Sequence, residues 1–248
     1  MRPLFAQGFH KPRDEGRTLD PEPRGRFMVN DALAPIEELL RIPSPAPRPQ
    51  GLACDGSDLW IGSIETSRIY GVRAQTGAVF EEGQGPGEPI GLVVIGDSIR
   101  VVSSEGADGD RFIRRYVMGH GFKSEAIRCP DSTGSFLAWD GDHLFLSQRY
   151  QQRILELDPL GAVIRTIPVP RQIIGMTIVN GRFVLMTCVN KECDDVRVLR
   201  VDARKESPEV TELAGVPFIG RSLAWDGNRY WTAAREENAL VAFTIPEA

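Results

Sequence analysis

The residues of this chain that could do chemistry are acids, arginines and amides in stretches expected to be loops. The candidate general bases are three glutamates, Glu65, Glu88 and Glu105. A glutamate can act as a general base where burial raises its pKa. The candidate ligand-binding residues are amides and arginines: Gln50, Gln148, Arg149, Arg171, Gln172, Asn190, Arg221 and Arg235. Arginine binds carboxylates and phosphates through two parallel hydrogen bonds, so the predicted ligand is a small polar or anionic molecule.

No metal site and no organic cofactor are predicted. The three histidines, His10, His120 and His143, lack the spacing of metal ligands. Asp108 and Asp110 alternate as in a calcium loop, but the stretch lacks the further acid that such a loop supplies. If the protein is an enzyme, we therefore expect acid–base chemistry without a cofactor, such as cyclisation, lactone opening or elimination.

Two of the four cysteines, Cys188 and Cys193, bracket one short stretch. Three states are open for them: free thiols, a disulfide across the stretch, and a reactive thiolate whose pKa is lowered by the neighbouring ammonium group of Lys191. A reducing cytosol favours the free thiols over the disulfide. Cys54 and Cys129 are expected to be packing residues.

Charge and hydropathy exclude several classes of function. The 248 residues carry a formal net charge of −5, which argues against a protein that binds nucleic acid by neutralising phosphates. No apolar run approaches the roughly 18 residues of a membrane span, and the first residues contain no hydrophobic signal core. We therefore expect a cytoplasmic protein with no nucleic-acid or membrane partner.

A repeated hairpin predicts the fold. An apolar run, an Asp-Gly or Asn-Gly turn, and a second run rich in aromatic and β-branched residues recur at 51–60, 136–145 and 222–231, and more loosely at 91–99 and 175–183. Such dipeptides favour tight turns between antiparallel strands. The turn glycines recur every 40 to 46 residues, a period typical of β-propeller blades.

The repeats predict an all-β protein with one five-bladed β-propeller domain over residues 27–248. The expected blades cover approximately residues 50–83, 90–130, 135–170, 174–214 and 221–246. The last blade lacks an outer strand, and the strand expected at 36–42 is left over when the other strands are assigned to blades. That strand should complete the last blade, which closes the ring and removes two exposed sheet edges. Residues 1–26, rich in Pro, Arg and acids, are interpreted as a flexible arm.

The candidate residues are expected around one mouth of the propeller channel. In this fold, the loops after the second strands and the links between blades share one face. The longest such loops are predicted at 104–110 and 188–195. Every blade should deliver at least one charged residue to this face, and loops on a rigid scaffold are where ligand sites usually form.

With the hairpins, the run 153–159 (Arg-Ile-Leu-Glu-Leu-Asp-Pro) and Gly77-Ala78-Val79 resemble small propellers of the glutamine cyclotransferase type. The chain resembles NHL and gluconolactonase-type propellers more loosely, and 83–88 (Gly-Gln-Gly-Pro-Gly-Glu) resembles the linker between blades of NHL-type repeats. The resemblance covers about residues 36–245 and implies the fold. The cyclotransferase family has its proposed acid–base glutamate where this chain has Ile61, with Glu65 nearby. Gln50 stands near the point where the gluconolactonase type has a metal ligand.

The sequence leaves three functions open. The first is an enzyme or binding protein for a small molecule at the channel mouth. The second is a scaffold that binds a protein partner, which is a common use of propellers. The third is a lectin-like module, which the sequence favours least because the four tryptophans lie within predicted strands, where packing explains them: Trp60, Trp139, Trp225 and Trp231.

Overall fold

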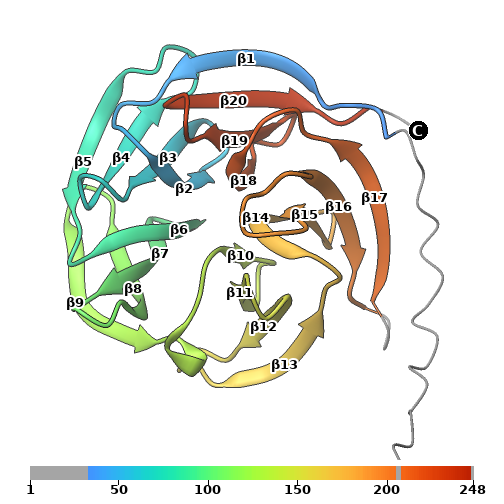
Figure 1. Ribbon diagram of the computed structural model, residues 1–248. Coiled ribbons are helices and arrows are strands. Elements are labelled where there is room, and N and C mark those ends of the chain that lie inside the picture. The colour runs from blue at the N-terminus through green and yellow to red at the C-terminus, as the bar shows by residue number, and fades with distance from the viewer. Residues whose placement is uncertain (1–32, 205–207, 247–248) are drawn as a thin grey trace, which may run out of the picture. The chain divides into compact units, whose positions relative to one another are not determined.

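The computed structural model describes residues 33–204 and 208–246, and this part of the chain forms a five-bladed β-propeller (Figure 1). Each blade is a four-stranded antiparallel sheet, and the innermost strand of each blade lies beside the channel. The predicted fold class is therefore confirmed. The arm predicted at residues 1–26 lies outside the described residues.

Blades 1 to 4 each use four consecutive strands, ordered from the channel outward. Blade 1 contains β2 (Pro49–Cys54), β3 (Asp58–Ser63), β4 (Arg68–Arg73) and β5 (Val79–Gln84), and blade 2 contains β6 (Glu88–Ile95), β7 (Ser98–Glu105), β8 (Asp110–Val117) and β9 (Gly121–Arg128). Blade 3 contains β10 (Leu137–Trp139), β11 (Leu144–Gln148), β12 (Arg153–Leu157) and β13 (Val163–Pro168). Blade 4 contains β14 (Gln172–Val179), β15 (Arg182–Cys188), β16 (Arg197–Asp202) and β17 (Glu209–Gly215). A short 3-10 helix, η1 (Pro130–Ser132), links blades 2 and 3.

Blade 5 joins the two ends of the described chain. It contains β18 (Gly220–Trp225), β19 (Tyr230–Ala234) and β20 (Ala239–Thr244), and its outer strand is β1 (Glu37–Pro43). β1 pairs antiparallel with β20, as predicted, and the blue and red strands lie side by side in Figure 1. Since β20 would otherwise present an open edge, this pairing closes the ring.

The repeated Asp-Gly turns are wider than the sequence predicted. Two-residue turns occur only at the looser copies, for example Asn180-Gly181, where both residues have positive φ. In blade 5, four residues (226–229) separate the paired residues Trp225 and Tyr230. The Asp226 carboxylate accepts hydrogen bonds from two backbone N–H groups of this turn and from Trp231 Nε1 at 2.8 Å. Burial disfavours the charged carboxylate, but these hydrogen bonds outweigh it and lower the pKa of Asp226.

One predicted loop is mostly strand. The stretch 104–110 of blade 2 was expected to be a long excursion, but β7 and β8 stay paired up to Glu105 and Asp110. Only a short turn remains, and Gly106 and Gly109 supply its positive φ angles. The loop predicted at 188–195 is present between β15 and β16. Of the two long loops predicted for the mouth face, the structure therefore has the one in blade 4 and replaces the one in blade 2 by a short turn.

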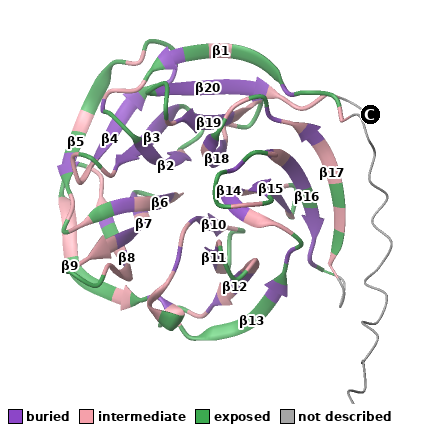
Figure 2. Ribbon diagram, viewed as in Figure 1, coloured by how far each residue is buried: buried purple, intermediate pink, exposed green. Residues whose placement is uncertain are grey.

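The hydrophobic core is divided among the five interfaces between adjacent blades. One apolar cluster lies between blades 5 and 1, for example, where Trp231 packs with Ile61 and with Ile42 of β1. The other interfaces have equivalent clusters. Figure 2 shows the buried residues in the inner and middle strands, whereas outer strands such as β13 are mostly exposed. Burial of these faces holds the blades together, so the mouth residues stand on a rigid frame.

Candidate functional site

The loops after the second strands and the links between blades meet at one end of the sheets. In blade 4, the first residue of β14, Gln172, is paired with the last residue of β15, Cys188. In blade 5, Gly220 is likewise paired with Ala234. This geometry brings part of the predicted set together around the loop 189–196, which belongs to blade 4.

Arg149 of blade 3 reaches across to this loop. Its Nε donates to Gln172 Oε1 at 3.1 Å, and its Nη2 lies 3.2 Å from Cys193 Sγ and 3.3 Å from the Lys191 backbone oxygen. Arg221 of blade 5 also contacts this sulfur, with Nη1 at 3.4 Å from Cys193 Sγ. Three neighbouring blades thus contribute to one cationic cluster.

The two cysteines are free thiols in direct contact, with 2.8 Å between Cys188 Sγ and Cys193 Sγ. The hydrogen bond from Cys188 and the charges of Arg221 and Arg149 lower the pKa of Cys193, and the same hydrogen bond raises the pKa of Cys188. These contacts therefore favour one shared thiolate, on Cys193 rather than on Cys188. The sequence suggested Lys191 as the activating cation, but Lys191 contributes a backbone oxygen and the two arginines supply the charge.

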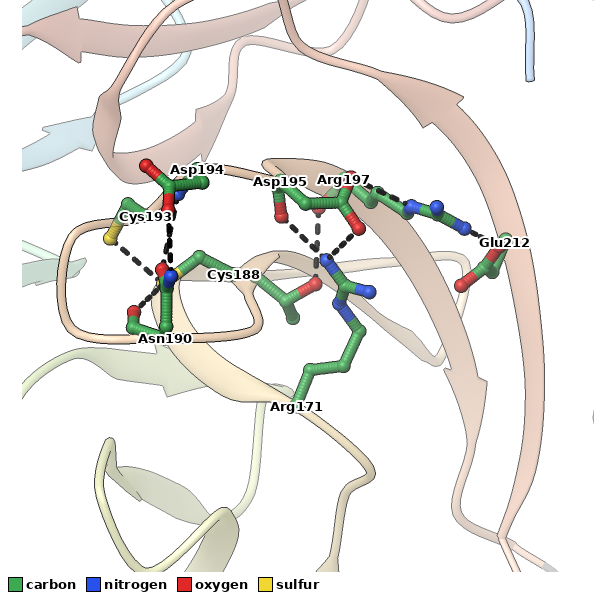
Figure 3. A network of polar contacts seen from close by, with 9 residues as sticks. Arg171, Cys188, Asn190, Cys193, Asp194, Asp195, Arg197 and Glu212 are labelled. Atoms are coloured by element: carbon green, nitrogen blue, oxygen red, sulfur yellow. Dashed lines mark hydrogen bonds and ion pairs between the residues drawn. The ribbon is translucent and has the colours of Figure 1, made fainter. Parts of the chain in front are cut away.

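A polar network holds the loop in shape (Figure 3). Asn190 Nδ2 donates to Asp194 Oδ2 at 2.8 Å, and the Asp194 backbone N–H donates back to Asn190 Oδ1. Arg171 Nη2 donates to the Asp195 carboxylate at 3.0 Å and also to its backbone oxygen. Arg197 binds the other oxygen of Asp195. Asn190 and Arg171, predicted as ligand-binding residues, are thus used to fix the loop.

A second part of the mouth lies between blades 5 and 1. Arg235 Nη1 donates to Gln50 Oε1 at 3.1 Å, and Arg235 Nε is buried with no hydrogen-bond partner among the described residues. Burial lowers the pKa of Arg235, and the positive charges of Arg48 and Arg221 lower it further. Since Arg221 is paired with Ala233 in the same blade, Arg235 lies close to the cationic cluster described above.

The three candidate acids have different surroundings. Glu105 forms a two-point ion pair with Arg114, at 2.6 and 2.9 Å, which lowers its pKa. Glu65 is exposed and lies 3.6 Å from Arg48. Glu88 is exposed, and its charge acts on Arg235 and on Arg111. Of the three, Glu88 has the surroundings most compatible with a role beside the arginines.

Gln148 is fully buried inside blade 3. Its Nε2 donates to the Pro130 and Thr133 backbone oxygens, and its Oε1 accepts from Arg153. These bonds use the whole amide, so Gln148 supports the link between blades 2 and 3. The buried position of the side chain was not recognisable from the sequence.

The channel contains a cavity of about 150 Å³ near its opposite end, among the halves of the inner strands that lead into the hairpin turns. Its lining includes Trp139, Trp225 and Cys54, which are half-buried. None of the predicted site residues, all of which are described, lines this cavity. In the described ranges, no group of three or more His, Cys, Asp or Glu side chains is placed to hold a metal ion.

The fold is similar to that of solved propellers with different functions. A glutaminyl cyclase of Myxococcus xanthus has a TM-score of 0.66 at 12% identity, covering 85% of this chain and 96% of its own. The PQQ-bound form of an aldose sugar dehydrogenase of Streptomyces coelicolor has a TM-score of 0.55 at 14% identity, covering 85% and 98%. No family model and no curated sequence matches the chain. The resemblance to cyclotransferase-type propellers is thus confirmed at the level of the fold.

The shared thiolate leads to a prediction that can be measured directly. We expect the ultraviolet absorbance of one thiolate to appear well below the ordinary cysteine pKa of about 8.5 as the pH rises. Cys54 and Cys129 should not contribute, because burial raises their pKa values to about 11 and about 12. Replacing Arg149 and Arg221 together by Gln should raise the midpoint by about one pH unit or more. An unchanged midpoint would show that the arginines do not stabilise the thiolate.

Proposed function

We propose that this protein binds a small anionic molecule at the mouth of the propeller, between blades 3, 4, 5 and 1. The observation that carries the proposal is the gathering of Arg149 and Arg235, from the turns after β11 and β19, with Arg221, the second residue of β18. Within the described parts of the chain, none of these three guanidinium groups forms an ion pair with a carboxylate. By contrast, Arg171 and Arg114 are ion-paired.

Physical chemistry supports a ligand here. Like charges in a partly buried position repel one another, and the buried Nε of Arg235 has no hydrogen-bond partner in the part of the chain that the structure describes. A carboxylate or phosphate would relieve both penalties, because guanidinium groups bind such anions through parallel charge-assisted hydrogen bonds. Gln50 and Gln172 already orient two of the arginines, so part of the ordering cost of binding is met before the ligand arrives.

The proposal is binding first, with acid–base chemistry as its extension. If the ligand is transformed, Glu88 is the acid we would assign to proton transfer. Glu105 and Glu65 have arginine partners of their own, whereas the charge of Glu88 acts on Arg235. We do not extend the proposal to glutaminyl cyclisation. The position that matches the family's glutamate is Ile61, which is fully buried in the core between blades 5 and 1.

As a further prediction, we expect the protein to act in the cytoplasm.

A thermal-shift screen tests the proposal. The purified protein is heated with inorganic phosphate, dicarboxylates, sugar phosphates and, as neutral controls, the corresponding free sugars. Binding to the native state raises the melting temperature by mass action, so an anionic class should raise it and neutral sugars should not. Arg221→Gln and Arg235→Gln should abolish the shift. The matched control, Arg200→Gln, removes an exposed arginine in the middle of β16 and should keep it.

The opposite result is equally clear. If no anion shifts the melting temperature, or if Arg200→Gln weakens the shift as much as Arg235→Gln does, the arginines do not form a specific site. The propeller would then be better explained as a scaffold for a protein partner.

A further inference from the structure

The Cys188–Cys193 pair has a geometry that anion binding does not explain. The two sulfur atoms lie 2.8 Å apart, closer than the packing of unrelated thiols requires. Cys188 is the last residue of β15, whereas Cys193 belongs to the loop. One sulfur is therefore anchored on a rigid strand, and the other is carried to it by the loop.

The loop backbone is shaped to bring Cys193 inward. Cys193 has a φ of +63°, a left-handed conformation that is unfavourable for a non-glycine residue. The Asn190–Asp194 hydrogen bonds and the Arg171–Asp195 ion pair hold the flanking residues (Figure 3). Strained backbone that its surroundings enforce in this way often marks a functional position.

Two cations approach the sulfur of Cys193 more closely than that of Cys188. Arg149 Nη2 lies 3.2 Å away and Arg221 Nη1 lies 3.4 Å away, whereas Cys188 Sγ is 3.7 Å from the same Arg149 atom. The sulfurs thus differ in electrostatic surroundings: Cys193 is arranged as a nucleophilic thiolate, and Cys188 remains a protonated neighbour.

From this arrangement we infer that Cys193 and Cys188 form a redox-active dithiol, in which Cys193 reacts with hydrogen peroxide and Cys188 resolves the product to a disulfide. This inference does not require an anion to bind at the mouth, although Arg149 and Arg221 belong to both sites. It differs from a structural disulfide because the reduced pair is already ordered and polarised.

The chemistry balances with peroxide as the oxidant. The Cys193 thiolate attacks one peroxide oxygen, so that an S–O bond forms, the O–O bond breaks and hydroxide leaves. The hydroxide takes up the proton that Cys193 released on ionising and becomes water. The Cys188 sulfur then attacks the Cys193 sulfenic acid, so that an S–S bond forms, the S–O bond breaks and the Cys188 proton leaves with the hydroxyl as a second water. Two thiols are oxidised by two electrons, and one peroxide is reduced to two waters.

The covering of the pair favours a small oxidant. Cys188 is 0% exposed and Cys193 is 2% exposed, but the residues that lie between them in sequence include the exposed Val189, Lys191 and Glu192. The exposed loop 189–192 therefore links the two buried cysteines along the chain. A peroxide molecule is small enough to reach a buried sulfur that a bulkier oxidant cannot contact, and the two guanidinium groups can donate hydrogen bonds to the leaving hydroxide.

Peptide mapping after peroxide treatment tests the inference on the full chain. Lys191 lies between the two cysteines, so tryptic cleavage after it should leave two peptides that stay joined only in the oxidised protein. We expect joined peptides after peroxide and separate peptides after a thiol reductant. Cys188→Ser should stop at a sulfenic acid on Cys193, which dimedone traps. The control Cys54→Ser should react as the wild type does.

Rates provide the second measurement. At neutral pH, Arg149→Gln and Arg221→Gln together should slow peroxide consumption about tenfold or more, because less of Cys193 is then thiolate. If Cys193→Ser does not fold, the wild-type peptide map and the rate of peroxide consumption by the double arginine variant still test the inference. The inference is overturned if peroxide leaves both cysteines unmodified, if Cys193 is oxidised to sulfinic acid without joined peptides, or if a folded Cys193→Ser reacts at the wild-type rate.

Discussion

Gly175→Ala is expected to lower the free energy of unfolding by about 3 kcal/mol or more. A Cβ at position 175 would lie 2.5 Å from the backbone carbon of Ser222 and 2.6 Å from its oxygen. These atoms belong to β18, the innermost strand of the next blade, and a backbone contact cannot be relieved by a rotamer change. Denaturant-induced unfolding, followed by circular dichroism, measures the change.

The control for this prediction is Gly215→Ala in β17. A Cβ there meets nothing within 4 Å, and the residue has no positive φ. It should therefore leave stability unchanged or raise it by up to about 1 kcal/mol. Equal losses for the two variants would contradict the close-approach explanation. Gly91 is in the same situation as Gly175, with Ser135 O 2.2 Å from its added Cβ, so Gly91→Ala should be similarly destabilising.

Removal of β1 is expected to have an effect at least as large. A chain that starts at Ser44 loses the pairing of β1 with β20 and the buried side chain of Ile42. It also uncovers β20, whose residues 239–243 are all buried. We expect a loss of more than about 4 kcal/mol, a large part of a typical domain's stability, and association through the open edge.

A chain that starts at Leu33 is the matched control, because it keeps β1 and differs from the shorter chain only in residues 33–43. Thermal unfolding and size-exclusion chromatography compare the two. Adding a synthetic peptide of residues 33–43 to the shorter chain should restore part of the melting temperature. If both chains unfold at the same temperature as monomers, ring closure by β1 does not contribute to stability.

The fold was predictable because the repeat has local physical causes. The Asp of each well-formed copy accepts turn hydrogen bonds, as Asp55, Asp140 and Asp226 all do. The glycine at the start of several copies recurs for a different reason. Gly51 and Gly175 lack the Cβ that would collide with the inner strand of the neighbouring blade. The repeat revealed the period, but it did not reveal that the turns are four residues wide.

The site was only partly predictable, because several candidate side chains have partners that are distant in sequence. Gln148 is used by the link that contains Pro130, and Glu105 is used by Arg114 on the neighbouring strand. The sequence placed the arginines on the correct face but could not indicate which of them lack a carboxylate. The approach of Arg149 and Arg221 to Cys193 depends on three blades at once, and a single sequence contains no local signal of it.

Isothermal titration calorimetry with inorganic phosphate and with succinate, on the wild type and on Arg235→Gln, tests the central claim most directly. We predict saturable binding of at least one of these anions to a single site in the wild type. Loss of one charge-assisted arginine contact should weaken this binding about 10- to 100-fold in Arg235→Gln, while Arg200→Gln binds as the wild type does. Equal affinity in the wild type and Arg235→Gln, or no saturable binding of either anion, would contradict an anion site at the propeller mouth.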